Sequence, residues 1–389
     1  MALRAAWLFD GTGSALIPDP VVLIKGPTIL DVGSGVAIPD GVRMTDLGGA
    51  TLLPGLVDTH VHLAFDTSAD VVGHLARQAD DEVVDAMAAA ARTALRGGVT
   101  TVRDLGDRGY LSLGLRGRAD LPHILAAGPP VTTPDGHCHF LGGATAPTAT
   151  GVRAAVRERA ERGVDVIKIM ASGGNLTPGS RQEAGQFPAG VLRAAVDEAH
   201  RLGLPVTAHA HATSAIADSV AAGVDGLEHA SFWAADGTDS PAELIQLIAD
   251  RQVVVGATIG MMPVPGLAPP PEVMIRVPAM TANLRRLYEA GAVMVAGTDA
   301  GIAPIKPHDV VRYSPAVLVQ LGMSPAQALR VITSGAAAVC GVGNRKGRIA
   351  AGYDADILAV GGDPLSELDA LHRIRAVYAR GAAVRGPEF

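Results

Sequence analysis

The sequence predicts an α/β protein: a (β/α)8 TIM barrel with a small β-sandwich domain formed by both chain ends. From Pro54 to about Val339, short β-rich runs alternate with longer Ala-rich segments of helical period. This alternation is typical of parallel strands joined by helical crossovers. Because it repeats eight times, a closed barrel is the expected architecture.

The expected strands are short and often end in a polar residue or glycine. In chain order they are Leu56–His62, Val99–Asp104, His123–Gly128, Val164–Met170, Pro205–His209, Gly226–His229, Val253–Thr258 and Val293–Asp299. A doubly wound open sheet is the alternative, but it should carry a Gly-rich phosphate turn after its first strand. His60, Val61 and His62 occupy that position, so the barrel is favoured.

Segments of helical period separate and follow these strands. They are Asp80–Arg96, Val152–Arg162, Gly190–Leu202, Ser214–Ala222, Pro241–Asp250, Ile275–Ala290, His308–Leu321 and Pro325–Val339. Five prolines between Met261 and Pro271 exclude a continuous helix there and predict a loop over one barrel mouth. The polar, Gly-containing segment Asn175–Phe187 predicts a mobile lid.

The two chain ends have a different pattern, in which short runs such as Val21–Lys25, Ala355–Val360 and Ile374–Tyr378 lie between Gly, Pro and Asp turns. Neither end is long enough for a core of its own, so we expect the two ends to pair. The predicted division is residues 1–53 plus 346–389 for the small β domain and residues 54–345 for the barrel.

Composition restricts the partners. The 389 residues carry 32 Lys and Arg against 39 Asp and Glu, a net charge of -7, with 3% aromatic residues, which argues against nucleic acid. Prolines interrupt the most apolar stretch, Val253–Pro271, before it could span a membrane. The stub Ala5–Phe9 is too short for a secretory signal core. Only Cys138 and Cys340 are present, so we expect a cytoplasmic protein without disulfides that acts on a small molecule.

Side chains able to bind a metal fall at or near the ends of five predicted strands, where the active sites of such barrels lie. They are His60, His62, Lys168, His209, His229 and Asp299. A single strand-end histidine is more often a packing residue, but coincidence across five strands favours a catalytic metal centre. Lys168 lies in an apolar strand, where an unpaired ammonium is costly unless it reaches solvent or changes its chemical form.

The motif Pro54-Gly-Leu-Val-Asp-Thr-His-Val-His-Leu63, combined with Lys168, the pair His209 and His229, and Gly297-Thr-Asp299, resembles the amidohydrolase superfamily. The most similar branch contains imidazolonepropionase-like proteins and Xaa-Pro dipeptidases. The resemblance covers almost the whole chain and extends to segments 98–105 and 352–358.

This resemblance implies a binuclear centre with two divalent ions, expected to be Zn²⁺. His60, His62 and Asp299 would hold one ion, and His209 and His229 the other. Lys168, carboxylated by carbon dioxide, would bridge them as an anion whose charge the cations neutralise. The ions would lower the pKa of a bridging water and polarise the scissile carbonyl, and Asp299 would act as general base and then acid.

Further histidines are candidates for contact with the substrate. His137 and His139 form a second His-x-His pair, but this pair lies in a loop, so it ranks below His60 and His62 as a metal site. The resemblance places His137 near the substrate carbonyl as an electrophile or oxyanion helper. His139 and His211 are expected to bind substrate, although helix capping or solvent exposure explains His211 equally well.

Two other residues are weaker candidates. For Arg103, a buried structural ion pair is favoured over carboxylate binding. Cys138 is disfavoured as a nucleophile because a metal-activated hydroxide already supplies that role.

The leading hypothesis is a zinc-dependent hydrolase that cleaves the amide bond of a dipeptide or N-acyl amino acid. A cyclic amide such as an imidazolone, or a small ester or lactone, is the alternative, and non-hydrolytic decarboxylation ranks third. A binding protein that has lost catalysis should lack several of the ligands, and none is missing here. The sequence leaves assembly into a homo-oligomer open.

Overall fold

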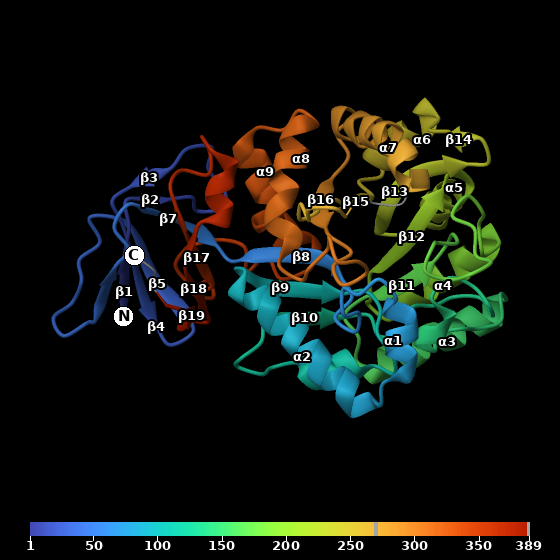
Figure 1. The fold of residues 1–389 in the computed structure, drawn as a ribbon, viewed down its shortest axis with the longest axis horizontal. Helices are drawn as coiled ribbons and strands as arrows, with labels where there is room; N and C mark the ends of the chain where they lie inside the picture. Colours follow the sequence, from blue (N-terminus) through green and yellow to red (C-terminus); the bar gives the residue numbers. More distant parts are fainter. Residues whose placement is uncertain (268–270, 387–389) are drawn as a thin grey trace.

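The computed structural model describes residues 1–267 and 271–386 and confirms an α/β architecture with parallel strands (Figure 1). Each of the eight predicted strands is present, although the sixth continues five residues beyond its predicted end at His229 and the fourth begins three residues later than predicted. They are β8 (Leu56–Val61), β9 (Val99–Asp104), β10 (His123–Ala126), β11 (Ile167–Met170), β12 (Val206–Ala212), β13 (Gly226–Ala234), β15 (Val254–Thr258) and β16 (Met294–Gly297).

These strands form two parallel sheets whose edges are linked. One sheet has the order β10-β9-β8, and the other has the order β11-β12-β13-β15-β16, with the short strand β14 (Gly237–Thr238) beside β13. A parallel bridge between Val61 and Ala300 connects β8 to the chain after β16. A second one, between Val131 and Ile169, connects the chain after β10 to β11. The eight strands therefore follow one another around a common centre in chain order (Figure 1).

Helices lie outside the strands in Figure 1 and match the predicted segments closely. They are α2 (Asp80–Arg96), α3 (Ala149–Arg162), α4 (Ala189–Arg201), α5 (Thr213–Ala222), α6 (Ala242–Asp250), α7 (Pro271–Glu289), α8 (Ser314–Gln320), α9 (Pro325–Val331) and α10 (Ser334–Val339). The short helix α1 (Val71–Arg77) was not predicted.

Two of the predicted helices are corrected by the structure. Segment 325–339 is not one helix, because the backbone of Thr333 leaves the helical region and separates α9 from α10. The break lets Ala336 and Ala337 pack against Val57 of β8. Segment 308–321 begins instead with a 3-10 turn at residues 310–313, and α8 follows.

The predicted loop at Met261–Pro271 is confirmed for residues 261–267, which contain no helix or strand. Residues 268–270 lie outside the described residues. Helix α7 begins at Pro271, a residue that the first turn of a helix accepts because no helical partner is needed for its nitrogen. Segment 175–187 is also irregular, and a bridge between Ser172 and Gly185 ties it back to the end of β11.

Both chain ends contribute to two further sheets. One has the order β5-β4-β1-β6 and the other the order β19-β18-β17-β7-β2-β3. These strands are β1 (Ala2–Arg4), β2 (Trp7–Leu8), β3 (Ile17–Pro18), β4 (Pro20–Lys25), β5 (Thr28–Ser34), β6 (Met44–Asp46), β7 (Ala50–Pro54), β17 (Ile357–Gly361), β18 (Ile374–Ala379) and β19 (Ala382–Arg385).

The pairing of β17 with β7 joins the two ends directly. In Figure 1 the blue and red strands accordingly lie side by side. Leu3, Leu52, Ile357 and Tyr378 share a hydrophobic cluster separate from the main core. The two ends of the chain therefore fold together.

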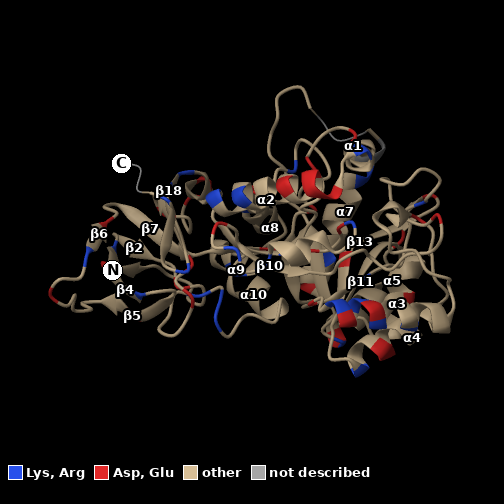
Figure 2. Ribbon diagram, turned by 90° about the horizontal axis from the view of Figure 1, so that it is seen from below, with Lys and Arg blue, Asp and Glu red and all other residues tan. Residues whose placement is uncertain are grey.

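Charged residues of both signs are interspersed along the outer helices, with no stripe of a single sign in Figure 2. Among the described residues, no helix combines the length and the apolar composition that crossing a bilayer requires.

We expect Asp356→Ala to destabilise the fold strongly. Lys346 is 3% exposed, and its ammonium lies 2.7 Å from Asp356 Oδ2 and 2.9 Å from Asp354 Oδ2. Removing one partner of a buried cation should lower the free energy of unfolding by about 3 kcal/mol, measured by urea denaturation. Glu367→Ala, which breaks the exposed pair with Arg373, is the control and should cost less than about 1 kcal/mol. An equal loss of unfolding free energy in the two variants would contradict the prediction.

Candidate metal centre

The first group of candidate ligands lies where β8 ends and just after β16. His60 Nε2 lies 3.3 Å from His62 Nε2, and Asp299 Oδ1 lies 3.5 and 3.2 Å from these two nitrogens. Both imidazoles are buried, and the Asp299 side chain is 15% exposed. The structure thus brings together the three residues that the sequence assigned to one ion.

The outer nitrogens of these two histidines have partners of their own. His60 Nδ1 donates to Glu228 Oε2 and His62 Nδ1 donates to the carbonyl of Gly106, each at 3.0 Å. The Nε2 atoms are then left with lone pairs that face Asp299. Such contacts orient imidazole ligands in metal sites.

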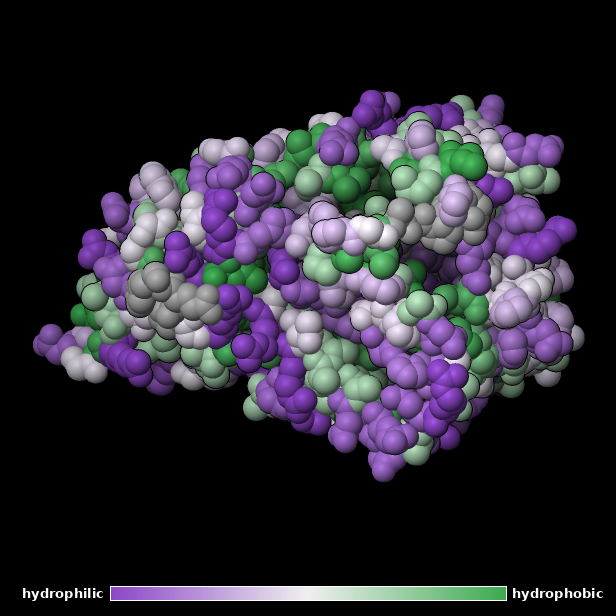
Figure 3. Space-filling model, viewed as in Figure 1, coloured by the Kyte–Doolittle hydropathy of each residue, from purple (hydrophilic) through white to green (hydrophobic). Residues whose placement is uncertain are grey.

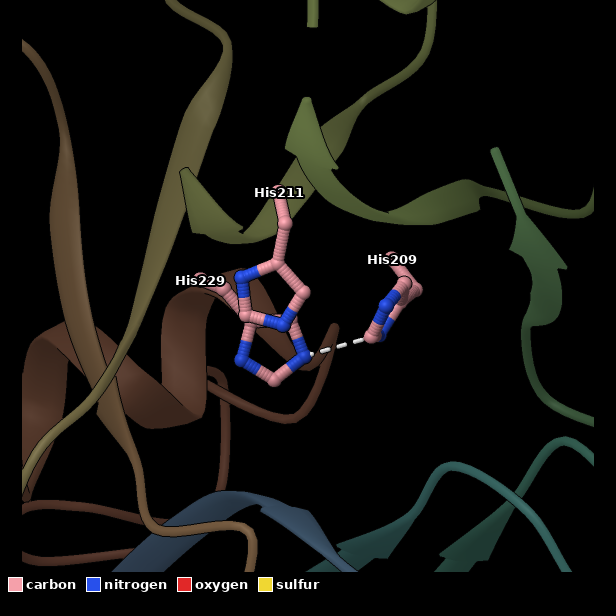
Figure 4. A group of neighbouring side chains, drawn as sticks. All are labelled: His209, His211 and His229. Carbon is pink, nitrogen blue, oxygen red and sulfur yellow. Dashed lines mark hydrogen bonds between the residues drawn. The ribbon is translucent and has the colours of Figure 1, made fainter. Parts of the chain in front are cut away.

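The second group comprises His209 and His211 from β12 and His229 from β13 (Figure 4). His229 Nε2 lies 2.9 Å from His209 Nδ1, and the rings of His211 and His229 stack with centroids 4.3 Å apart. His209 and His229 were predicted together, whereas His211 was predicted to face substrate. One ligand atom from each of the three residues lies within 4.8 Å of the others.

Each of these rings also has a hydrogen-bond partner on its far side. His209 Nε2 donates to the carbonyl of Gly173 at 3.0 Å, and His229 Nδ1 lies 2.8 Å from Thr258 Oγ1. His211 Nδ1 lies 2.9 Å from Ser231 Oγ. In this structure the facing nitrogens of His209 and His229 are hydrogen-bonded to each other (Figure 4), and the same two nitrogens would serve as ligands if a cation took the place of the shared proton.

Lys168 shares this buried environment with both groups, which meet where the rings of His60 and His229 are 5.3 Å apart. It is 1% exposed, and among the described residues its Nζ has no hydrogen-bond partner. Burial, partly offset by the carboxylates of Glu228 and Asp299, lowers the pKa of Lys168 to about 8. Because an isolated buried ammonium is costly, these residues fit an anionic form of Lys168 beside two cations.

In Figure 3 the surface is hollowed in the half that contains the eight strands.

Sequence reasoning missed Glu228, which connects several of these elements. It is 1% exposed, and its carboxylate accepts from His60, from Arg103 Nη2 at 3.0 Å and from Thr207 Oγ1 at 2.7 Å. Burial alone would raise the pKa of Glu228, but His60 and Arg103 hold it at about 2. The predicted structural ion pair of Arg103 is thereby confirmed. The signal in the sequence was an acidic residue inside the strand Gly226–His229.

Asp58 was also missed, although it lies within the first motif. Its Oδ1 accepts from the backbone nitrogens of His60 and Thr298 at 3.2 and 3.1 Å, and its Oδ2 accepts from Thr298 Oγ1 at 2.6 Å. This carboxylate therefore fixes the end of β8 against the turn that carries Asp299.

Two of the candidate ligands have unusual backbone conformations. His229 has φ 72° and Asp299 has φ 60°, in the left-handed region that is uncommon for residues other than glycine. Strain of this kind persists where the surroundings determine it, often at functional sites. For Asp299 the surroundings include a hydrogen bond from its backbone nitrogen to the carbonyl of His60 at 2.8 Å.

His137 lies beside the second group, with its ring centroid 4.6 Å from that of His209. Its Nδ1 is buried without a partner among the described residues. Burial, with a smaller effect from His211, lowers the pKa of His137 to about 3, so the ring is neutral. It occupies the space beside Gly174, where an added Cβ would lie 2.3 Å from its Nε2.

His139 makes its contacts outside the two ligand groups. His139 Nδ1 donates to the carbonyl of Gly136 at 3.0 Å, and its ring is 6.2 Å from that of Phe140. Within the described part of the chain, no ring contact joins His139 to either group, so its role in binding substrate stays a prediction. Burial raises the pKa of Cys138 to about 12, which keeps it a thiol and agrees with its rejection as a nucleophile.

Three proteins that are similar to this chain have been given names that describe an activity. Ochratoxinase of Aspergillus niger is 26% identical over 99% of this chain and 86% of its own. Imidazolonepropionase of Deinococcus radiodurans is 26% identical over 94% of this chain and 92% of its own. A solved structure of a Xaa-Pro dipeptidase with methionine bound in its active site has a TM-score of 0.84, with 26% identity over 99% of each chain.

The match to a defined family covers most of the sequence. Residues 51–384 match the Amidohydrolase family, and these residues include every side chain of the two ligand groups. The family has the hydrolytic activity and the divalent-metal chemistry that the donor set fits. The chain belongs to the amidohydrolase family.

Proposed function

We propose that the protein is a binuclear, zinc-dependent amidohydrolase that cleaves the amide bond of a dipeptide or N-acyl amino acid. One observation carries the proposal: two groups of ligand-type side chains adjoin each other, with the unpaired Nζ of Lys168 buried among them. The similarity to a Xaa-Pro dipeptidase and to ochratoxinase supports an amide as the substrate.

The proposed ligands are taken from both groups of side chains. His60, His62 and Asp299 would hold one ion, and His209 and His229 the other, with carboxylated Lys168 as the shared anionic ligand. Imidazole and carboxylate donors suit zinc. Two such ions, when bound, supply an activated water and polarise the scissile carbonyl.

Side chains of the protein would transfer the proton and stabilise the carbonyl oxygen. Despite burial, His60 and His62 hold the pKa of Asp299 well below its usual range, so the carboxylate is ionised and can serve as a metal ligand. Asp299 takes the proton of the attacking water and passes it to the leaving amine. His137, neutral and without a partner for Nδ1, donates to the carbonyl oxygen as negative charge develops there.

We also propose the domain boundaries and the cellular compartment of the protein. We take the eight linked strands to be a closed (β/α)8 barrel spanning residues 54–345, with residues 1–53 and 346–389 as the small β domain. Cys138 and Cys340 are both free, which suits a cytoplasmic enzyme.

The similarity to an imidazolonepropionase favours a second candidate, hydrolysis of a cyclic amide or a small ester or lactone. A library of N-acyl amino acids and Xaa-Pro dipeptides, assayed for released amine beside imidazolones and lactones, distinguishes the two. Release of amine from the linear amides is expected. If the amides stay intact while lactones turn over, the preferred substrate class is wrong.

Removing the amine of Lys168 should remove metal. We expect about two zinc ions per chain in the wild type, measured by plasma emission, and less than about one in Lys168→Ala. Carbon-13-labelled bicarbonate should give a carbamate signal by nuclear magnetic resonance in the wild type and none in Lys168→Ala. Lys25→Ala, at an exposed position of β4, is the control and should keep both. Stoichiometric metal in Lys168→Ala would count against the bridging role.

Gly174→Ala should impair catalysis without removing metal. The new Cβ would meet the His137 ring and displace it, so we expect kcat to fall about 100-fold through the lost carbonyl contact. Gly190→Ala is the control, because a Cβ there meets nothing within 4 Å. Full activity of Gly174→Ala would show that His137 does not contact the reacting carbonyl.

A further inference from the structure

Arg276 lies outside the candidate metal centre and contacts Trp233, whose ring lies next to one of the histidines. Arg276 lies on α7, and its Cζ is 4.0 Å from the centroid of the Trp233 ring. Trp233 lies near the end of β13, is 6% exposed, and has its ring 5.5 Å from that of His211. Trp233 therefore borders the second histidine group, and Arg276 of α7 packs against Trp233.

Both residues present a buried hydrogen-bond donor that has no acceptor. Within residues 1–267 and 271–386, Arg276 Nη1 and Trp233 Nε1 are buried and unpaired. No described carboxylate lies within 4.0 Å of Arg276. Arg276 is partly buried, and two arginines that are fully buried are paired: Arg103 bonds Glu228 at 3.0 Å, and Arg159 bonds the carbonyl of Pro129 at 2.8 Å.

Leaving buried donors unpaired costs free energy, and the cost is greater for a charged group. Two such donors on stacked side chains beside a catalytic centre indicate an acceptor that arrives with the ligand. A carboxylate fits best, because its two oxygens match the planar guanidinium and can accept from a second N–H.

A nearby hollow limits the charge that this ligand can carry. Trp233 also lines a hollow of about 630 Å³ together with Glu183, Asp239 and Glu243. A ligand with several negative charges would be repelled by these acids, so a single carboxylate is the expected anion.

We infer that Arg276 and Trp233 bind the carboxylate of the amino acid that leaves as amine. The inference rests on the proposed function and deepens it, because it names the residues that would recognise the carboxylate that dipeptides and N-acyl amino acids carry on their leaving side. Arg276 is thus a specificity residue on an outer helix, separate from the groups that carry out the chemistry.

The kinetic test compares the best amide substrate of the zinc-loaded enzyme with its C-terminal carboxamide. Wild type should prefer the free acid. Arg276→Gln should lower kcat/KM for the acid by about 10- to 100-fold, mainly through KM, and change the carboxamide little. Arg276→Lys should recover part of the loss, and Trp233→Phe should weaken the preference for the acid by removing Nε1.

A matched control separates the local contact from the change in charge. Arg285→Gln removes the same charge from the same helix, where Arg285 Nη2 donates to the carbonyl of Gln320 at 2.8 Å. It should leave the preference for the acid unchanged. If Arg276→Gln lowers turnover of the acid and the carboxamide alike, the carboxylate subsite is overturned while the proposed function stands.

A binding test does not depend on hydrolysis. The chain has two tryptophans, so Trp7→Phe leaves Trp233 as the only indole reporter. L-Methionine should change its fluorescence saturably and L-methioninamide should not, and Arg276→Gln should abolish the response. This result without any amide hydrolysis would refute the proposed function and keep the subsite. The same response from both ligands, or from neither, would refute the subsite.

Discussion

The burial of the Lys168 amine without a partner is the constraint on which the centre depends. A charge at that depth requires counter-charges, and the described neighbours of Nζ provide no direct contact. Histidines from three strands surround the same region with their outer nitrogens already bonded. In the proposed centre, an anionic lysine between two cations would satisfy the lysine and the ligand nitrogens together.

The surrounding residues keep these ligands in place. Asp58 bonds the turn before Asp299, and Glu228 connects Arg103 to His60. The left-handed backbone at His229 and Asp299 costs of order 1–3 kcal/mol per residue, which buried hydrogen bonds of this kind can offset. The protein thus accepts local strain to hold its ligands in position, as preorganised catalytic sites do.

The periodicity of the sequence predicted all eight strands, and its motifs predicted which side chains meet at their ends. The break at Thr333 could not be predicted, because it arises from packing of Ala336 and Ala337 against a strand about 280 residues earlier. The place of His211 depends on ring stacking with His229, which spacing in the sequence does not determine. Glu228 was visible as a buried charge, but its partners depend on how the strands are aligned.

The proposed role of Arg276 could not be predicted from the sequence for a different reason. Its segment carries no motif, and only the three-dimensional contact with Trp233 relates it to the histidines. In folds of this type the strand ends supply the chemistry, while connecting segments vary and select the substrate. An arginine on α7 can therefore change without disturbing the ligands of the metal centre. A substrate-selecting residue is expected where the strands no longer constrain the sequence, so its identification requires the structure.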